Sequence, residues 1–283
     1  MKLPPFDYAR PSTVAEAVAL LAAHDGEAKP LAGGQSLVPM LAFRVAAPAL
    51  VVDLGKLDEL AQIRISEAGV ALGAMVRWRD ILADARLRNA HPLLVAAVEN
   101  VAHYQIRNRG TVGGSLAHAD PAAELPCIAV TCEADIVVLG KAGPRSIAAA
   151  EFFLGPLSTA LKSDEIIIEL RLPAWPAWRR FGFAEFSRRH GDFALAGAAV
   201  FYDRDGGKAH HTHVGAIGAA DRPIRLASAE AAVNGNGLDD KAIVAAAAAA
   251  RAAIDPPSDI HASGAYRRAL IGTMIERALS ASV

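Results

Sequence analysis

Cysteine is scarce in this sequence: only Cys127 and Cys132 occur among its 283 residues. Two thiols are too few for an iron–sulfur cluster or for a four-cysteine zinc site. They also cannot form the disulfide framework that small secreted domains depend on. The sequence therefore excludes these three kinds of structure from the chain.

An excess of charge of one sign is also missing. The chain has 29 Lys and Arg residues against 30 Asp and Glu, which gives a net charge of −1 and a pI of about 6.8. A nucleic-acid-binding domain normally carries a basic excess or a basic patch. We therefore predict that the protein has no nucleic-acid partner.

Long apolar segments are absent as well. The richest apolar run, residues 243–250, is much shorter than the roughly 20 residues that cross a bilayer. The N-terminal residues do not resemble an export signal, because Pro4, Pro5 and Asp7 come early and Glu16 interrupts the first apolar stretch. We predict no membrane span, a cytoplasmic location and two reduced cysteines.

Apolar residues are nevertheless plentiful enough for a large core. They make up 53% of the chain, which is typical of a globular protein, and the length corresponds to about two domains. The sequence Pro-Ala-Trp-Pro at 173–176 breaks all hydrophobic periodicity, so we place the main boundary there. The predicted domains are 1–176, with lobes of about 1–55 and 56–176, and 177–283.

Periodicity and turn residues predict the order of the elements. A capping box, with Thr13 as N-cap and Glu16 reaching back to it, begins a helix that Asp25-Gly26 ends. In the first domain we predict strands before Gly33 and at 50–52, a hairpin of 63–65 with 70–72, helices at 78–85 and 92–101, and strands at 136–139 and 166–168. In the second we predict strands at 181–186, 196–202 and 213–217, the last two joined by a turn at 203–207, and helices at 227–233, 239–253 and 263–280.

Two glycine pairs with similar polar neighbours stand out. Ala32-Gly33-Gly34-Gln35-Ser36 follows a predicted strand, and Thr111-Val112-Gly113-Gly114-Ser115 lies 80 residues further along. Glycine allows positive φ and has no Cβ, so consecutive backbone amides can converge on an anion. Either pair alone would be an ordinary turn. Together they predict two turns that hold a pyrophosphate from both sides.

Other nucleotide and metal motifs do not occur. The stretch 215–218 lacks the G-x-G-x-x-G pattern of nicotinamide dinucleotide sites, and no G-x-x-x-x-G-K-[ST] is present. His210, His211 and His213 are close in sequence, but without nearby cysteine a surface strand is the better interpretation. We therefore predict no metal ligands on this chain.

The glycine motifs resemble those of a known family. KPLAGGQSL at 29–37 is similar to the first FAD signature of the flavoprotein (medium) subunits of molybdenum hydroxylases, of the carbon monoxide dehydrogenase and xanthine dehydrogenase type. RNRGTVGGS at 107–115, followed by ADPAAELP at 119–126, resembles the second signature. The resemblance covers essentially the whole chain, including SRR at 187–189 and GDFA at 191–194.

This resemblance implies an α+β protein with a two-lobed FAD-binding domain of the p-cresol methylhydroxylase type and a smaller C-terminal domain with a small antiparallel sheet and helices. FAD would lie in a cleft, with Glu124 binding the adenosine ribose, Asp120 as a second candidate for that role or for ordering the loop, and Leu161 and Ile106 as apolar contacts. The implied cofactor-binding residues are Lys29, Leu31, Ala32, Gly33, Gly34, Gln35, Ser36, Leu37, Ile106, Gly110, Thr111, Gly113, Gly114, Ser115, Ala117, Asp120, Glu124, Leu161 and Phe193.

Three positions depart from the family pattern. Gln35 stands where relatives often have His, and Ser115 where Asn or Asp is common. Phe193 occupies the place of a Tyr near the isoalloxazine ring in many relatives. Phenylalanine can cover a ring face but cannot hydrogen-bond to it. A gating role that depends on the hydroxyl is therefore not expected here.

The function implied by the resemblance is electron transfer. A large partner subunit would carry the molybdenum cofactor and a small one two [2Fe–2S] clusters, in a heterotrimer that dimerises. This chain would relay electrons through FAD to an external acceptor, with no catalytic acid, base or nucleophile of its own. The alternative is a stand-alone FAD-dependent oxidase or reductase of a small molecule, and a scaffold that has lost FAD is disfavoured by the intact glycine motifs.

Overall fold

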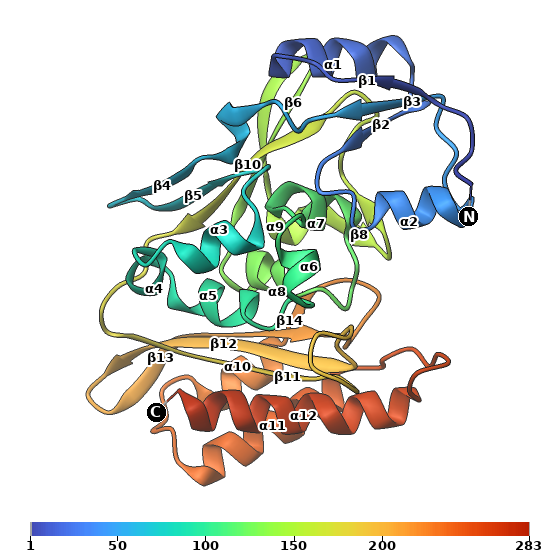
Figure 1. The fold of residues 1–283 in the computed structure, drawn as a ribbon. Coiled ribbons are helices and arrows are strands. Elements are labelled where there is room, and N and C mark those ends of the chain that lie inside the picture. Colours follow the sequence, from blue (N-terminus) through green and yellow to red (C-terminus); the bar gives the residue numbers. More distant parts are fainter. Residues whose placement is uncertain (1, 283) are drawn as a thin grey trace.

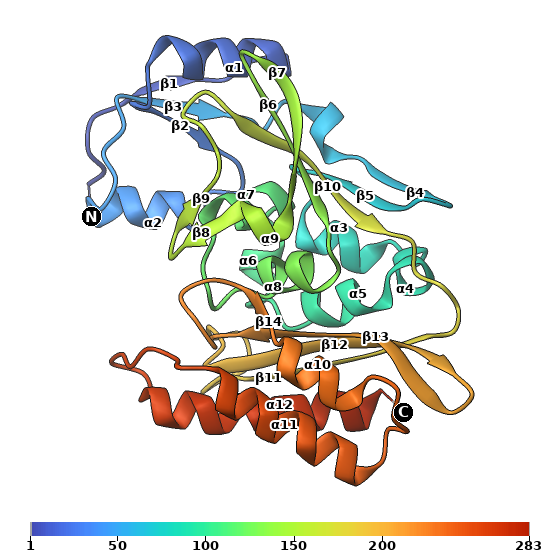
Figure 2. The same cartoon turned by 180° about the vertical axis from the view of Figure 1, so that it is seen from behind.

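The computed structural model describes residues 2–282, which form a stack of layers (Figure 1). The helix α1 (Val14–Ala23) lies at one end, above two sheets that belong to the first domain. A layer of short helices follows, then a third sheet, then two long helices at the other end (Figure 2). The predicted α+β class is confirmed.

The N-terminal lobe is a small parallel sheet covered by α1. Its other elements are β1 (Asp7–Ala9), β2 (Ala28–Leu31), α2 (Leu37–Ala42) and β3 (Leu50–Asp53), with the strand order β1-β3-β2. Thr13 caps α1 as predicted and accepts a hydrogen bond from the Glu16 amide at 3.2 Å. The Glu16 carboxylate reaches the amide and the hydroxyl of Ser12 instead of the Thr13 amide, because Ser12 offers two donors.

The second lobe is built on an antiparallel sheet with the order β4-β5-β10-β6-β7. Its strands are β4 (Ile63–Ser66), β5 (Gly69–Gly73), β6 (Asp135–Gly140), β7 (Gly143–Ala148) and β10 (Ile166–Pro173), and a separate hairpin joins β8 (Phe153–Gly155) and β9 (Ser158–Thr159). Its helices are η1 (Asp58–Ala61), α3 (Trp78–Ala83), α4 (Leu87–Ala90), α5 (Pro92–Val98), α6 (Tyr104–Arg107), α7 (Val112–His118), α8 (Glu124–Thr131) and α9 (Ala149–Phe152).

The sequence patterns found some of these elements and missed others. The hairpin predicted at 63–65 and 70–72 is confirmed as β4 and β5. The helices predicted at 78–85 and 92–101 end earlier, at Ala83 and Val98. The helices α7 and α8 were not predicted, because glycine and proline residues interrupt their sequences.

The C-terminal domain is a four-stranded antiparallel sheet followed by helices. It consists of β11 (Arg179–Phe186), β12 (Ala196–Asp205), β13 (Lys208–Ile217), β14 (Ile224–Arg225), α10 (Ala227–Val233), α11 (Asp240–Ala253) and α12 (Gly264–Ala281). The three predicted strands and the hairpin between the last two are confirmed. The third strand begins at Lys208, five residues before its predicted start, because the turn is shorter than expected.

Both faces of this sheet are buried. Side chains alternate along a strand, and in β12 Ala196, Ala198 and Val200 pack in the core beneath the C-terminal helices. Ala199 and Phe201 point the other way and belong to the same hydrophobic core as the second lobe. The apolar core is therefore continuous from the first domain into the second.

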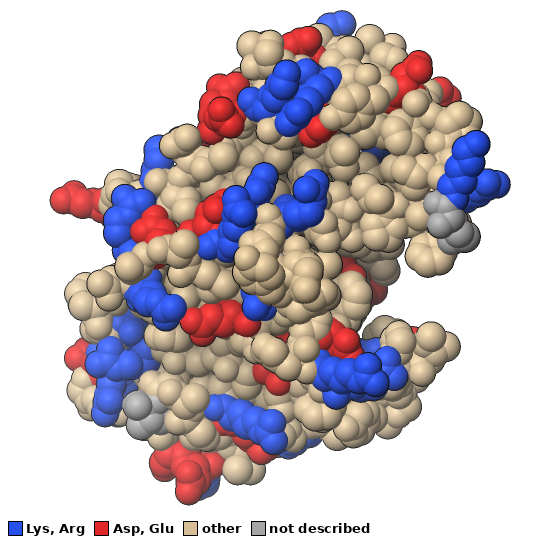
Figure 3. Space-filling model, viewed as in Figure 1, with Lys and Arg blue, Asp and Glu red and all other residues tan. Residues whose placement is uncertain are grey.

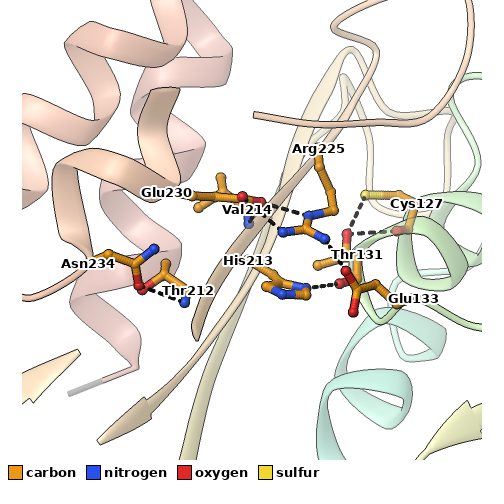
Figure 4. A network of polar contacts seen from close by, with 9 residues as sticks. All are labelled: Cys127, Thr131, Glu133, Thr212, His213, Val214, Arg225, Glu230 and Asn234. Atoms are coloured by element: carbon orange, nitrogen blue, oxygen red, sulfur yellow. Dashed lines mark hydrogen bonds and ion pairs between the residues drawn. The ribbon is translucent and has the colours of Figure 1, made fainter. Parts of the chain in front are cut away.

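A polar network joins the two domains at the C-terminal end of α8 (Figure 4). Arg225 of β14 forms ion pairs with Glu230 of α10 at 2.8 Å and with Glu133, which follows α8, at 2.5 Å. His213 of β13 lies with its Nδ1 2.7 Å from the Thr131 carbonyl oxygen and donates to it. The network thus holds the end of α8 from the side of the C-terminal domain.

The surface position predicted for the three neighbouring histidines is wrong for His213. It is half-buried between the domains, because the last carbonyl groups of α8 need a donor. Burial lowers the pKa of His213, which keeps the imidazole neutral. Nearby, a Cβ on Gly215 would stand 1.8 Å from Thr131 Oγ1. The backbone of the C-terminal domain therefore packs directly against the side chain of Thr131, with no room for a side chain at position 215.

Within residues 2–282, no helix combines the length and the apolar character that crossing a bilayer requires. Figure 3 shows Lys and Arg side chains interspersed with Asp and Glu over this face of the molecule, without a broad area of one sign. The same view shows the surface hollowed beneath the position of α2, between the N-terminal lobe and the C-terminal domain.

Candidate functional site

The two glycine pairs lie against each other. The first follows β2 and the second begins α7. A Cβ on Gly33 would stand 2.2 Å from the Arg109 carbonyl oxygen and 3.0 Å from the Gly110 Cα, while one on Gly114 would stand 3.7 Å from the Ala32 Cβ. The fold thus brings together the two motifs that the sequence places 80 residues apart.

The first motif carries a run of free backbone amides. In the part of the chain that the structure describes, the amides of Gly33, Gly34, Gln35 and Ser36 donate to no protein acceptor, and the Ser36 hydroxyl has no partner. Gly34 adopts a φ of +73°, which the sharp turn requires. The Gln35 side chain folds back and donates to the Gly33 carbonyl at 3.2 Å. Successive free amides of this kind form an anion-binding concavity.

The second motif is the start of a helix and not an open turn. Thr111 caps α7 and accepts from the Gly114 amide at 3.1 Å. The amides of Val112 and Gly113 donate to carbonyl groups of the segment 74–76 at 2.9 and 2.8 Å. The prediction that this motif also presents free amides is wrong, because the helix cap and the neighbouring chain already use them.

The second motif still shapes the site. The Ser115 hydroxyl has no partner within residues 2–282 and is available to a ligand. A Cβ on Gly110 would stand 2.6 Å from Trp78 Nε1, and one on Gly113 would stand 2.6 Å from the Ala74 Cβ. These two glycines are therefore required by packing inside the protein, and their contact with a cofactor stays a prediction.

The other predicted contacts differ in how far they are buried. Ile106 of α6 is tied to the second motif, since its carbonyl accepts from the Gly110 amide at 2.7 Å. Lys29 of β2 and Ala117 of α7 are exposed, and Leu31, Leu37 and Leu161 are half-buried. Leu161 lies on a separate loop after β9 and shares no hydrogen bond with either motif in the described chain. Their contacts with a cofactor stay predictions.

Two predicted carboxylates lie at the start of α8. Asp120 accepts from the Ala122 amide at 2.8 Å, and this contact orders the loop before the helix. Glu124 is the first residue of α8 and is half-buried. Burial raises the pKa of Glu124 to about 7, and the charge of Asp120 contributes in the same direction. Glu124 is therefore a carboxyl group that lacks a protein cation to stabilise its charge.

A third carboxyl group, Glu185 of β11, was missed by the sequence analysis. Its Oε2 atom is buried and has no hydrogen-bond partner. Burial raises the pKa of Glu185 to about 8, and the charge of Glu124 adds to this effect. The signal was present in the sequence, because Phe181, Phe183 and Glu185 alternate along one strand and a carboxylate on such an apolar face is unusual.

Arg109 was quoted within a motif but was not predicted to act in the site. Its Nε donates to the Gly33 carbonyl at 3.4 Å, across the junction of the two motifs. The side chain is exposed. The structure thus holds a cation beside the free amides of the first motif, which composition and motif spacing did not reveal.

Phe193 lies on the segment that joins β11 to β12. This segment rests against the first domain, since a Cβ on Gly191 would stand 2.7 Å from the Ala102 carbonyl oxygen. The Phe193 side chain is 73% exposed, so it is not packed in a core. An exposed phenylalanine at the border of the two domains is free to cover a ligand.

Together these features fit a dinucleotide with a diphosphate and several hydroxyl groups. The free amides of Gly33 to Ser36 match an anion, and the carboxyl groups of Glu124 and Glu185, whose pKa values are raised by burial, match hydroxyl donors. No three His, Cys, Asp or Glu side chains gather into a possible metal site anywhere in residues 2–282. The residues present are therefore suited to hold FAD.

Comparison with known families covers nearly the whole chain. Residues 4–175 match the family described as the FAD binding domain in molybdopterin dehydrogenase. Residues 181–282 match the family described as the CO dehydrogenase flavoprotein C-terminal domain.

Individual relatives align with almost the whole length of this chain. The chain is 40% identical over 281 residues to the 6-hydroxypseudooxynicotine dehydrogenase complex subunit alpha of Paenarthrobacter nicotinovorans, covering 99% of this chain and 95% of that one. It is 36% identical to the carbon monoxide dehydrogenase medium chain of Hydrogenophaga pseudoflava, covering 99% and 97%. The structure of a carbon monoxide dehydrogenase from Hydrogenophaga pseudoflava, which lacks the Mo-pyranopterin moiety of its cofactor, matches with a TM-score of 0.97 at 38% identity, covering 100% and 98%. The chain belongs to the FAD-binding medium subunits of the molybdenum hydroxylases, a family of oxidoreductases.

Proposed function

We propose that this chain relays electrons from [2Fe–2S] clusters of a small partner subunit to an external acceptor, in a cytoplasmic complex whose large subunit carries the molybdenum cofactor. The complex is a dimer of heterotrimers in this proposal. When bound, FAD supplies the redox chemistry, since it accepts electrons singly and gives them up as a pair. The observation that carries the proposal is the junction of the two glycine motifs, where free amides and Arg109 meet.

The residues of this chain act in the proposal by binding and orienting the cofactor. The amides of Gly33 to Ser36 and the hydroxyls of Ser36 and Ser115 hold the diphosphate, Glu124 accepts from ribose hydroxyls, and Phe193 covers the flavin. The apolar residues Leu31, Leu37, Ile106 and Leu161 enclose the rings. No residue of the chain has to transfer a proton to a substrate, in contrast to a stand-alone oxidase.

The isolated chain tests this proposal. We expect it to purify with FAD, to be reduced by dithionite and to be reoxidised by an added quinone or by oxygen. It should not be reduced by compounds that relatives act on, such as nicotine, caffeine or carbon monoxide. Absorbance at the flavin bands, followed anaerobically, reports each step. Reduction of the isolated chain by such a compound would favour the stand-alone oxidase, and a chain that binds no FAD would refute the proposal altogether.

The pH dependence of FAD binding provides a second test. Glu124 has a pKa of about 7, and only its carboxylate form accepts hydrogen bonds on both oxygens. Well below pH 7 its ionised fraction falls about tenfold per pH unit, so we expect the Kd for FAD to rise by up to that factor. Isothermal titration between pH 5.5 and 7.5 measures this slope, a range in which Glu185 stays largely protonated. Glu124→Gln is the control and should bind FAD more weakly with a flat profile, and an equal slope in both proteins would contradict the assignment.

A further inference from the structure

The strand β11 presents alternate side chains to two different neighbours. Phe181 and Phe183 pack against the core of the first domain, while Ala184 and Phe186 pack against the core beneath the C-terminal helices. Because successive side chains in a strand point to opposite faces, Glu185 shares the face of Phe181 and Phe183. The C-terminal domain therefore presents a carboxyl group to the FAD-binding domain at a position where its neighbours on the strand are phenylalanines.

This carboxyl group is left without a protein partner. Glu185 Oε2 is buried and makes no hydrogen bond, and the surroundings of Glu185 include Glu124 and the buried thiol of Cys127 rather than a cation. Buried polar atoms are almost always paired, and an unpaired one destabilises the fold. The strand register fixes the residue on the face it shares with Phe183, where the Oε2 atom is buried although the residue as a whole is only half-buried.

The surroundings of Glu185 indicate what it pairs with. Glu124, which our proposed function places on the ribose of FAD, is close enough that its charge raises the pKa of Glu185. The two carboxyl groups make no hydrogen bond to each other. A ligand group that donates hydrogen bonds between them would satisfy both, and ribose hydroxyls and the adenine amino group are donors of this kind.

We propose that Glu185 binds FAD, with its Oε2 accepting a hydrogen bond from the adenosine half of the cofactor. The inference rests on the proposed function and extends it, because it makes the C-terminal domain a part of the adenosine site and not only a cover over the flavin. Cofactor binding then joins the two domains through Glu124 on one side and Glu185 on the other. Removal of FAD leaves Glu185 Oε2 as an unpaired buried atom between the two domains.

Replacement by leucine separates this role from a structural one. Glu185→Leu keeps the approximate size and removes the unpaired group, so we expect the cofactor-free chain to melt at a higher temperature than the wild type. The same variant should bind FAD up to about tenfold more weakly, which corresponds to the loss of one hydrogen bond to an uncharged group. Glu185→Gln retains an acceptor oxygen and should recover most of the affinity. Isothermal titration gives the Kd and differential scanning calorimetry gives the melting temperature.

Measuring the Kd for ADP beside that for FAD shows which half of the cofactor Glu185 contacts. We expect Glu185→Leu to weaken ADP and FAD by the same factor, since both contain the adenosine. Phe183→Leu is the matched control on the same strand face, and it should lower the melting temperature without changing either Kd. If the leucine variant does not fold, Glu185→Ala provides the same comparison of FAD with ADP.

Three results would overturn the inference while leaving the proposed function intact. The first is an unchanged Kd for FAD in the Glu185→Leu and Glu185→Ala variants. The second is a loss of FAD affinity without a loss of ADP affinity, which would place Glu185 at the flavin half. The third is an equal loss in Phe183→Leu, which would indicate a packing effect. A wild-type chain that binds no FAD would instead refute the proposed function itself.

Discussion

Gly114→Val is expected to give a folded protein that has lost FAD. A Cβ at this position would stand 3.7 Å from the Ala32 Cβ, so a valine would close the gap between the two glycine motifs. Within the described residues it crowds Thr111 Oγ1, at 2.8 Å, so the valine also weakens the Thr111 cap of α7 and should lower the melting temperature somewhat. We expect the Kd for FAD to rise more than a hundredfold, equivalent to about 3 kcal/mol of lost binding free energy.

The flavin content after purification and the Kd from fluorescence titration measure this loss. Gly237→Val is the matched control, because Gly237 has ordinary φ and its nearest non-neighbouring atom is 3.8 Å away on a distant loop. Gly34→Val is less informative, since the φ of +73° at Gly34 strains any valine there. A Gly114→Val protein with full flavin content would show that the cofactor does not pass between the motifs.

Phe193→Ala is expected to speed the reoxidation of the reduced flavin by oxygen several-fold. The side chain is 73% exposed at the border between the domains, so its removal uncovers whatever lies beneath it. Because the ring is not packed in a core, the free energy of unfolding should change by less than about 1 kcal/mol, well below the 3–5 kcal/mol of a core Phe→Ala change. Stopped-flow absorbance gives the reoxidation rate, and thermal melting gives the stability.

Phe193→Tyr is the control for this prediction. It conserves the area of the ring and adds a hydroxyl, so we expect only a modest change in the reoxidation rate and in the flavin potential. Wild-type reoxidation and wild-type flavin fluorescence in Phe193→Ala would show that the ring does not cover the flavin.

Much of the fold was predictable because its strands follow simple patterns. The β-branched runs of β6 and β10 and the alternation in β11 and β12 have the period of a buried strand, so all four strands are recognisable in the sequence. The helix α7 was not predictable in the same way. It contains Gly113 and Gly114, which have low helix propensity, and it is stabilised by the Thr111 cap and by hydrogen bonds to the turn at 74–76 that follows β5.

The sequence predicted the candidate site only at the positions that belong to a short glycine motif. The glycine pairs marked its centre, but their spacing gave no indication that the amides of Val112 and Gly113 are already used by the segment 74–76. Glu185 was missed because its alternation with Phe181 and Phe183 shows only that the three share a face, and not that Oε2 is buried there without a partner. Non-local packing therefore decides which polar groups remain free for a ligand.

The continuous core between the domains determines whether the chain can be split into two polypeptides and whether its C-terminal domain can be replaced. Ala199, Phe201 and Ile217 of the C-terminal sheet share one apolar cluster with the second lobe, and the connection at 174–176 has no regular structure, although Trp175 packs against that cluster. Cohesion therefore comes from the interface and not from the covalent link. If the gene were split at the connection, the two halves would still assemble without the covalent link. A chimera with another C-terminal domain would not fold unless the whole interface, including Thr131 and Gly215, were transferred with it.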